Sequence, residues 1–203
     1  MGDIDDAIMC FKNARTLTSD LGIKSRSYLL EDDAYKLLGI DYIDKKINNL
    51  ENAVKELSVY GNLVHTELLA DAYSQKASTL YSNEKFEYYK KALNCYEEIS
   101  SRGLDTPITK NNMAIIYQYI GNYYEAEKIL NDIIKEYPKD YKGYIKLAFL
   151  EIDKQATYKN ENRDYSKAIN YYNLARKYLD VPDDVEMIRL SRLIEDIKSK
   201  GWV

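Results

Sequence analysis

His65 is the only histidine in the chain, so a general-base site or a metal site that used imidazole would depend on this residue. Glu67 stands close to it in sequence and could orient the ring in a hydrolytic site. No metal-ligand spacing surrounds His65, and we expect a partly exposed structural histidine at the start of a helix. A hydrolytic enzyme that uses His65 with Glu67 stays the least favoured alternative.

Nucleotide-binding and catalytic motifs are also absent from the sequence. The nearest two glycines, Gly22 and Gly39, are too far apart for a GxGxxG turn or a P-loop. Neighbouring carboxylates such as Glu97 and Glu98 fall on predicted solvent-facing helix surfaces, where such pairs are ordinary. The sequence therefore predicts no catalytic residues, no cofactor and no metal site, and we expect a non-catalytic chain.

The charge balance narrows the choice of partner. Lysine and arginine total 29 against 33 acidic residues, which gives a net charge of -4 and a pI of about 5.2. This composition lacks the basic excess with which proteins bind a phosphate backbone. No apolar run approaches the ~20 residues that span a bilayer. We expect a protein or peptide partner, with no nucleic acid and no direct membrane insertion by this segment.

Two amphipathic helices are predicted on either side of Gly121. Thr106 can cap the first helix with Pro107 in its first turn, and Pro138 ends the second because its ring cannot continue the hydrogen-bond ladder. The first helix carries Met113, Ala114 and Tyr117, and the second carries Ala126, Leu130 and Ile133. The alanines would let the two helices approach closely while the larger side chains fill the gaps.

The same spacing recurs along the chain. The second-helix pattern returns at Ala7/Phe11/Ala14, Ala92/Tyr96/Ile99 and Ala168/Tyr172/Ala175, and a weaker copy has Lys46 in the alanine place before Leu50 and Ala53. The first-helix pattern returns at Leu69/Ala70/Tyr73 and at Leu147/Ala148, where Glu151 replaces the tyrosine. These patterns resemble the tetratricopeptide repeat, in which helix pairs stack into an array.

The resemblance implies an all-α, right-handed α-solenoid of about ten helices that forms a single superhelical domain over residues 1–203. We expect a lone second helix at 2–16, helix pairs at about 25–58, 62–101, 107–138 and 141–180, and a capping helix at 183–200. Extra residues in two of the pairs predict longer first helices there, the last followed by a polar loop at 158–163. The lone first helix indicates the C-terminal portion of a longer protein.

The resemblance also implies a concave binding face made by first-helix residues that do not pack the pair. These residues are Glu67, Asp71, Asn111, Asn112, Ile115, Gln118, Tyr119, Lys142, Lys146 and Phe149, with Ser74, Gln75 and Ile145 on the same face. In the family's site for a peptide carboxylate, Asn112, Lys142 and Lys146 match three places. Glu67 and Asp71 occupy two others and reverse the charge there, so we expect a mixed-charge extended peptide.

Tyrosine dominates the aromatic residues, with 21 against 3 phenylalanines and 1 tryptophan. The repeat positions predict a buried ring for Tyr73, Tyr96, Tyr117, Tyr123, Tyr165 and Tyr172. A second set, Tyr88, Tyr89, Tyr119, Tyr141, Tyr144 and Tyr158, is expected to include side chains that face solvent or a partner. Exposed tyrosines suit recognition because the ring gives a large contact area at low entropic cost.

The last third of the chain resembles the tails of bacterial serine/threonine protein kinases that carry C-terminal tetratricopeptide repeats. The resemblance lies in residues 137–151, 161–175 and 193–203, and no glycine-rich loop, HRD or DFG of a kinase domain is present. It implies a sensing or docking region of a larger kinase, in the cytoplasm or, beyond a membrane anchor, on the extracytoplasmic side. A peptide-pheromone sensor domain is the alternative.

Overall fold

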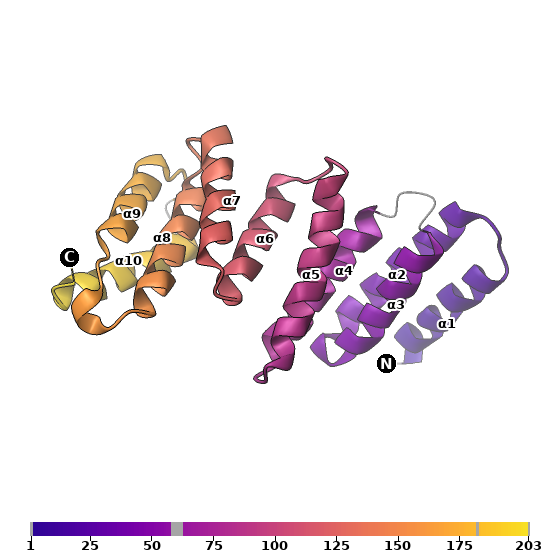
Figure 1. The fold of residues 1–203 in the computed structure, drawn as a ribbon. Coiled ribbons are helices and arrows are strands. Elements are labelled where there is room, and N and C mark those ends of the chain that lie inside the picture. The colour runs from indigo at the N-terminus through magenta and orange to yellow at the C-terminus, as the bar shows by residue number, and fades with distance from the viewer. Residues whose placement is uncertain (1, 58–62, 182, 203) are drawn as a thin grey trace. The chain divides into compact units, whose positions relative to one another are not determined.

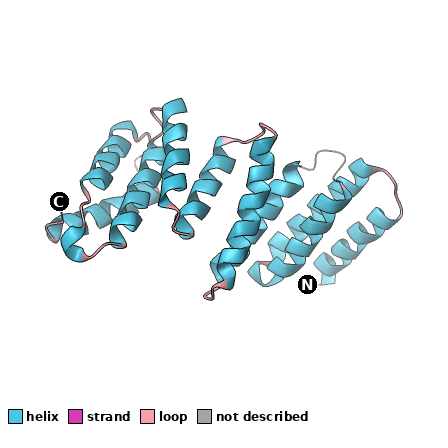
Figure 2. Cartoon of the chain, viewed as in Figure 1, coloured by secondary structure: helices cyan, strands magenta, loops and turns pink. Residues whose placement is uncertain are grey.

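The computed structural model describes residues 2–57, 63–181 and 183–202, and the regular structure in these ranges is helical (Figures 1 and 2). The described residues form ten α-helices and no strand, which confirms the all-α prediction. The chain divides into two compact units, Met1–Asp105 and Thr106–Val203. A continuous right-handed solenoid over residues 1–203 stays a prediction, and residues 1, 58–62, 182 and 203 of the expected ranges lie outside the described residues.

The first unit is a series of helices in which each packs on the next. The helices are α1 (Gly2–Thr16), α2 (Leu21–Leu38), α3 (Ile43–Glu56), α4 (Leu63–Thr79) and α5 (Glu84–Ser101), with a 3-10 turn, η1, at Ile40–Tyr42. α2 begins earlier than the expected residue 25, because the Asp20 carboxylate accepts hydrogen bonds from the backbone N–H groups of Gly22 and Ile23.

The α4/α5 pair buries the side chains that the repeat pattern predicts. Leu69, Ala70 and Tyr73 of α4 and Ala92, Tyr96 and Ile99 of α5 are all buried. The Tyr73 hydroxyl donates to Glu51 Oε1 of α3 at 2.6 Å, and the Tyr96 hydroxyl donates to Asp71 of α4. These tyrosines thus bury a ring and keep a partner for the hydroxyl.

Lys46 of α3 explains the weak copy of the repeat. Its side chain is 6 % exposed, and its Nζ lies 3.6 Å from Oδ1 of the fully buried Asp32 of α2. The second Asp32 oxygen lies 2.9 Å from Lys36 Nζ. A buried charge is tolerated only when it is paired, so the Asp32 carboxylate allows a lysine where the other copies have alanine.

The second unit begins with a well-capped helix. Its helices are α6 (Pro107–Tyr119), α7 (Tyr123–Glu136), α8 (Tyr141–Ala156), α9 (Ser166–Tyr178) and α10 (Val185–Ser199), with a 3-10 turn, η3, at Asn160–Asn162. Thr106 and Thr109 form a capping box, and Gly121 turns the chain between α6 and α7 at a φ of 80°. The predicted longer helices are confirmed: α4 has 17 residues and α8 has 16, against 13 in α6.

Two clusters of buried side chains lie in the core of the second unit. Ala114 of α6 packs with Ala126, Leu130 and Ile133 of α7 and with residues of α8. Met187, Leu190, Ile194 and Ile197 of α10 are buried against α8 and α9. Glu151, in the tyrosine place of α8, is buried, and its Oε2 lies 3.6 Å from Lys167 Nζ of α9. The expected role of α10 as a helix that covers the preceding pair agrees with this packing.

Candidate functional site

A pocket of about 370 Å³ lies in the second unit and is lined by α6, α8 and α10. Half of the predicted binding residues meet there. They are Ile115, Gln118 and Tyr119 of α6 and Lys146 and Phe149 of α8. Ile152 and Asp153 of α8 and Glu186, Arg189 and Leu193 of α10 complete the lining. The volume falls in the range of about 300–1,000 Å³ that is typical of ligand sites.

The helical period places these residues on one side of each helix. Ile115 and Tyr119 are one turn apart on α6, and Lys146 and Phe149 are one turn apart on α8. Ala114, which packs toward α7, lies on a different side of α6 from Ile115. One face of α6 therefore builds the core and another remains available to line the pocket.

Polar contacts tie the three helices together around the pocket. Gln118 Nε2 of α6 donates to Asp153 Oδ2 of α8 at 2.5 Å. The Arg189 guanidinium of α10 lies 5.2 Å from the centre of the Phe149 ring of α8, which is a cation–π distance. The pocket thus combines aromatic and aliphatic surface with charges of both signs.

Lys146 is a cation of this pocket whose pKa is shifted by its surroundings. Burial lowers its pKa, and Lys142 lowers it further, whereas Glu186 and Asp140 raise it. Among the described residues, no carboxylate lies within ion-pair distance of Lys146 Nζ. A partly desolvated ammonium in this position favours a ligand that brings a carboxylate.

Five predicted surface residues do not line the pocket. Asn111 and Asn112 are half-buried on α6, and Lys142 is exposed with its Nζ 5.9 Å from the Tyr141 ring. Glu67 and Asp71 belong to the first unit, where Asp71 accepts the hydroxyl of Tyr96. Of the three residues that match the family's carboxylate site, only Lys146 lines the pocket. Ile145 of α8 was expected on the binding face, and this is wrong because its side chain is fully buried in the core of the second unit.

His65 is buried, so the partial exposure predicted for it is wrong. Its Nε2 donates to the backbone oxygen of Ser25 at 3.3 Å, and its ring meets the Tyr28 ring edge-on at 6.5 Å. Both partners belong to α2, which begins earlier than the sequence indicates. Burial lowers the pKa of His65, and this geometry fits a structural side chain.

The tyrosines expected at the surface divide into two groups. Tyr119 is 58 % exposed and lines the pocket, and Tyr158 is also exposed. Tyr88 is half-buried and Tyr89, Tyr141 and Tyr144 are buried, so the recognition role expected of Tyr141 and Tyr144 is wrong. The Tyr141 hydroxyl donates to Asp184 Oδ2 and the Tyr144 hydroxyl to the backbone oxygen of Pro138, each at 3.1 Å. These bonds satisfy the polar end of each buried ring.

The sequence predicts that α10 covers the preceding helix pair, but it does not predict that residues of α10 line the pocket. Glu186, Arg189 and Leu193 each precede a buried residue of α10, namely Met187, Leu190 and Ile194. They therefore lie at one edge of the apolar stripe. The helical spacing of Glu186, Arg189 and Leu193 is the signal in the sequence that indicates a shared face of α10.

Comparison with known proteins gives likeness to solved structures and no family. No family model matches the chain, and no curated protein matches it. The chain is similar to the crystal structure of MamA protein, with a TM-score of 0.40 and 15% sequence identity over 88% of this chain and 93% of that chain. Within the described residues, no helix has both the length and the apolar character needed to cross a bilayer.

Proposed function

We propose that the chain is a protein-interaction module that binds an extended, mixed-charge peptide segment of a partner in the pocket between α6, α8 and α10. The observation that carries the proposal is the lining of that pocket. Five residues of the predicted binding face lie there with three residues of α10, and they combine apolar surface with charges of both signs. Peptide sites of helical proteins commonly pair an apolar anchor with flanking charges.

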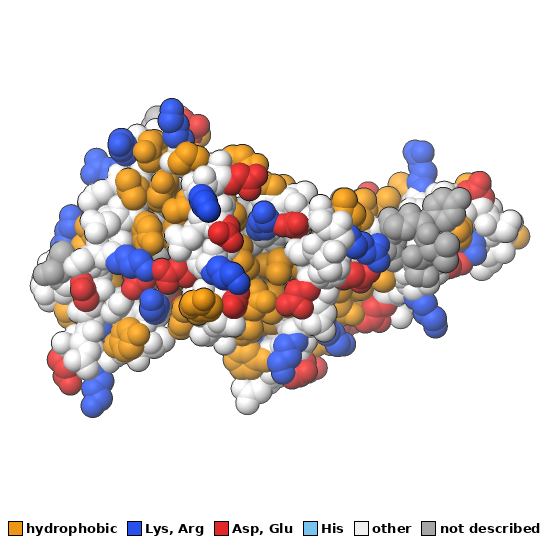
Figure 3. Space-filling view, turned by 45° about the horizontal axis from the view of Figure 1, so that its top comes forward, with side chains coloured by type: hydrophobic (Ala, Val, Ile, Leu, Met, Phe, Trp, Pro, Cys, Tyr) orange, Lys and Arg blue, Asp and Glu red, His pale blue; other side chains and the backbone are white. Residues whose placement is uncertain are grey.

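The lining suggests how such a segment would be recognised. Ile115, Phe149 and Leu193 provide apolar surface for one side chain of the peptide. Lys146 and Arg189 favour an acidic neighbour, and Glu186 favours a basic one. On the face drawn in Figure 3, acidic and basic side chains lie beside one another and beside hydrophobic ones.

The proposal extends to the setting of the module. The kinase-like segments 137–151 and 193–203 include much of α8 and the end of α10, two of the helices that line the pocket. We therefore favour a sensing or docking region of a bacterial serine/threonine kinase, on the cytoplasmic side. This setting rests on the sequence resemblance alone.

Selection of short peptides from a displayed library against the full chain tests the proposal. The affinity of a selected peptide is then measured by fluorescence anisotropy. Tyr119→Ala is expected to weaken binding by about 10-fold or more, as for an aromatic hot spot. Arg189→Glu is expected to disfavour peptides with an acidic residue beside the anchor.

Tyr124→Ala is the matched control, because Tyr124 is an exposed tyrosine of α7 that does not line the pocket. Its affinity for the peptide should equal that of the wild type. A library that yields no binder, or a selected peptide that tolerates Tyr119→Ala as well as Tyr124→Ala, would refute the proposed pocket.

A further inference from the structure

A second pocket, of about 340 Å³, lies entirely within the first unit, among α1, α2, η1 and α3. Its buried polar side chains are Glu31 of α2 and Asn49 of α3, and Arg15 of α1 lies beside them. It is separate from the helix faces that the repeat resemblance assigns to binding, because most of its lining comes from α1 and α3, both of which carry the second-helix pattern. The ligand of this pocket must therefore be inferred from its own lining residues.

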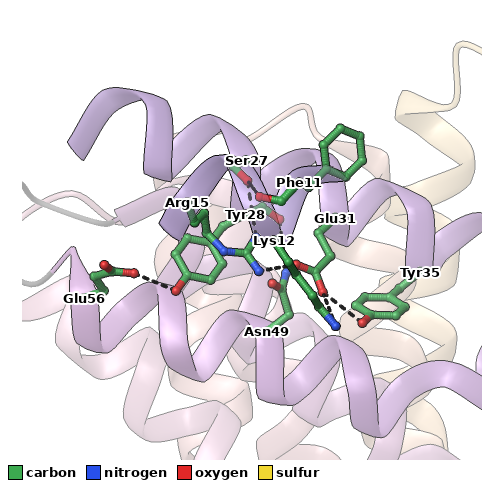
Figure 4. Close-up of polar contacts among 9 residues, drawn as sticks. All are labelled: Phe11, Lys12, Arg15, Ser27, Tyr28, Glu31, Tyr35, Asn49 and Glu56. Atoms are coloured by element: carbon green, nitrogen blue, oxygen red, sulfur yellow. Dashed lines mark hydrogen bonds and ion pairs between the residues drawn. The ribbon is translucent and has the colours of Figure 1, made fainter. Parts of the chain in front are cut away.

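The charges at the inner wall of this pocket are already paired. Glu31, which is 1 % exposed, accepts from Arg15 Nη2 at 2.5 Å and from the Tyr35 hydroxyl at 2.9 Å, and Lys12 Nζ lies 3.5 Å away (Figure 4). The Arg15 guanidinium also stacks 4.1 Å from the centre of the Tyr28 ring. An anionic ligand placed deep in the pocket would meet a buried carboxylate, so the inner wall favours a neutral group.

Asn49 provides the unsatisfied group. Its side chain is 4 % exposed, and its Nδ2 donates to the backbone oxygen of Tyr28 at 3.1 Å, which fixes the orientation of the amide. Its Oδ1 is buried and has no hydrogen-bond partner among the described residues. The amide points toward the Arg15–Glu31 pair (Figure 4). A buried acceptor without a donor is costly, so the site calls for an N–H or O–H group from the pocket.

Two further amides line the same pocket. Asn48 and Asn52 are exposed and lie one helical turn apart on α3, beside Asn49. An amide side chain offers one acceptor and two donors, which matches the alternating N–H and C=O groups of a peptide main chain. Lys12 and Lys45 also line the pocket and outnumber the one exposed acid there, Asp5.

We propose that this pocket binds an extended peptide segment through its main chain. Asn49 Oδ1 accepts a peptide N–H, and Asn48 and Asn52 bond to the main chain on either side. Lys12 and Lys45 favour an acidic side chain next to the bound peptide unit. The first unit would then hold a main-chain recognition site, independent of the pocket between α6, α8 and α10.

Side-chain amide NMR signals of the full-length, ¹⁵N-labelled chain test this proposal. The probes are acetyl-Gly-Gly-Gly-dimethylamide and its N-methylated counterpart built from sarcosine, which has no N–H group. The glycine peptide is expected to shift the signals of Asn48, Asn49 and Asn52, and the sarcosine peptide is not. Acetyl-Gly-Asp-Gly-amide is expected to bind more tightly than acetyl-Gly-Lys-Gly-amide.

The variants keep the test independent of folding. Asn48→Ala with Asn52→Ala changes only exposed side chains and is expected to weaken the glycine peptide by about fivefold or more. Asn13→Ala, an exposed asparagine of α1 outside the pocket, is the matched control. Tyr119→Ala should leave this binding unchanged, which separates failure here from failure of the proposed function.

Three outcomes would overturn the proposal. The first is an equal shift with the glycine and sarcosine peptides, which would remove the role of the main-chain N–H. The second is the same set of shifts with inorganic phosphate, which would make the pocket an anion site. The third is no shift with either peptide, which would leave Asn49 Oδ1 to a bound water.

Discussion

The Arg15 guanidinium of α1 and the Glu31 carboxylate of α2 form an ion pair with a 2.5 Å contact between Nη2 and Oε2. The Glu31 side chain is 1 % exposed and that of Arg15 is 12 % exposed. Ser27 Oγ accepts a further bond from Arg15 Nη1 at 3.4 Å. This pair is the main polar link between the first two helices among the contacts of the described residues.

Arg15→Ala is expected to destabilise the chain by about 3 kcal/mol, because it leaves a buried carboxylate with only partial compensation from Tyr35 and Lys12. Urea unfolding followed by circular dichroism measures the loss. Arg102→Ala is the control, since it removes an exposed pair with Glu98 and should cost about 1 kcal/mol or less. Equal losses in the two variants would contradict the buried role of Arg15.

His65 predicts a pH dependence of stability. Burial lowers its pKa from the ordinary value of 6.5, so the unfolded chain binds the proton more readily than the folded chain. The stabilisation is complete above the unfolded-state pKa and is lost as the pH falls through the folded-state pKa. We expect the urea midpoint to fall between about pH 7 and about pH 5, and His65→Gln to flatten that dependence.

The carboxylates titrate alike in the wild type and in His65→Gln, so the difference between the two pH profiles isolates the imidazole. Parallel profiles over this interval would show that His65 does not titrate differently in the folded and unfolded states.

The close approach of α6 and α7 predicts intolerance of larger side chains. Ala126 is fully buried and packs with Ala114, so Ala126→Leu is expected to cost about 1–3 kcal/mol through overpacking. Ala156→Leu, at the exposed end of α8, should change stability by less than about 0.5 kcal/mol. Thermal unfolding of the two variants compares them directly, and a stable Ala126→Leu protein would mean that the helices are not in close contact there.

The two thiols are expected to react at different rates. Burial raises the pKa of Cys95 to about 11, whereas Cys10 is exposed. Because the thiolate is the reactive form, iodoacetamide should modify Cys10 faster than Cys95 by about tenfold or more at neutral pH. Peptide mass spectrometry at timed intervals measures both sites. In urea the two rates should converge, and equal rates in the folded protein would be evidence against the burial of Cys95.

The helix pairs were predictable because the spacing of small and large residues is a local property of the sequence. Ala92 and Tyr96 occupy repeat positions, and both are buried as that spacing requires. The start of α2 lies outside the repeat spacing because the Asp20 cap sets it, and an aspartate cap is a separate local signal. The burial of His65 is not predictable from helix bounds, because Ser25 and Tyr28 of α2 reach it through a tertiary contact.

The binding residues were only partly predictable because a pocket depends on tertiary contacts. Tyr119 and Phe149 follow from helical periodicity on α6 and α8. Arg189 does not, because the side of α10 that faces the pocket depends on how this helix packs on α8 and α9. Asn49 was missed for a related reason: its missing hydrogen bond is visible only when the neighbours of its amide oxygen are known.

The hydrogen bonds that buried tyrosine hydroxyls donate to glutamates limit which substitutions the chain tolerates. Tyr28 donates to Glu56 at 2.7 Å and Tyr73 to Glu51 at 2.6 Å, in each case from one helix to another. A phenylalanine at position 73 would preserve the shape of the core, whereas loss of the exposed acid at position 51 would leave the hydroxyl of the buried Tyr73 without this partner. Related sequences are therefore expected to keep an acid wherever they keep the tyrosine, so that the tyrosine-rich composition is inherited as pairs of positions.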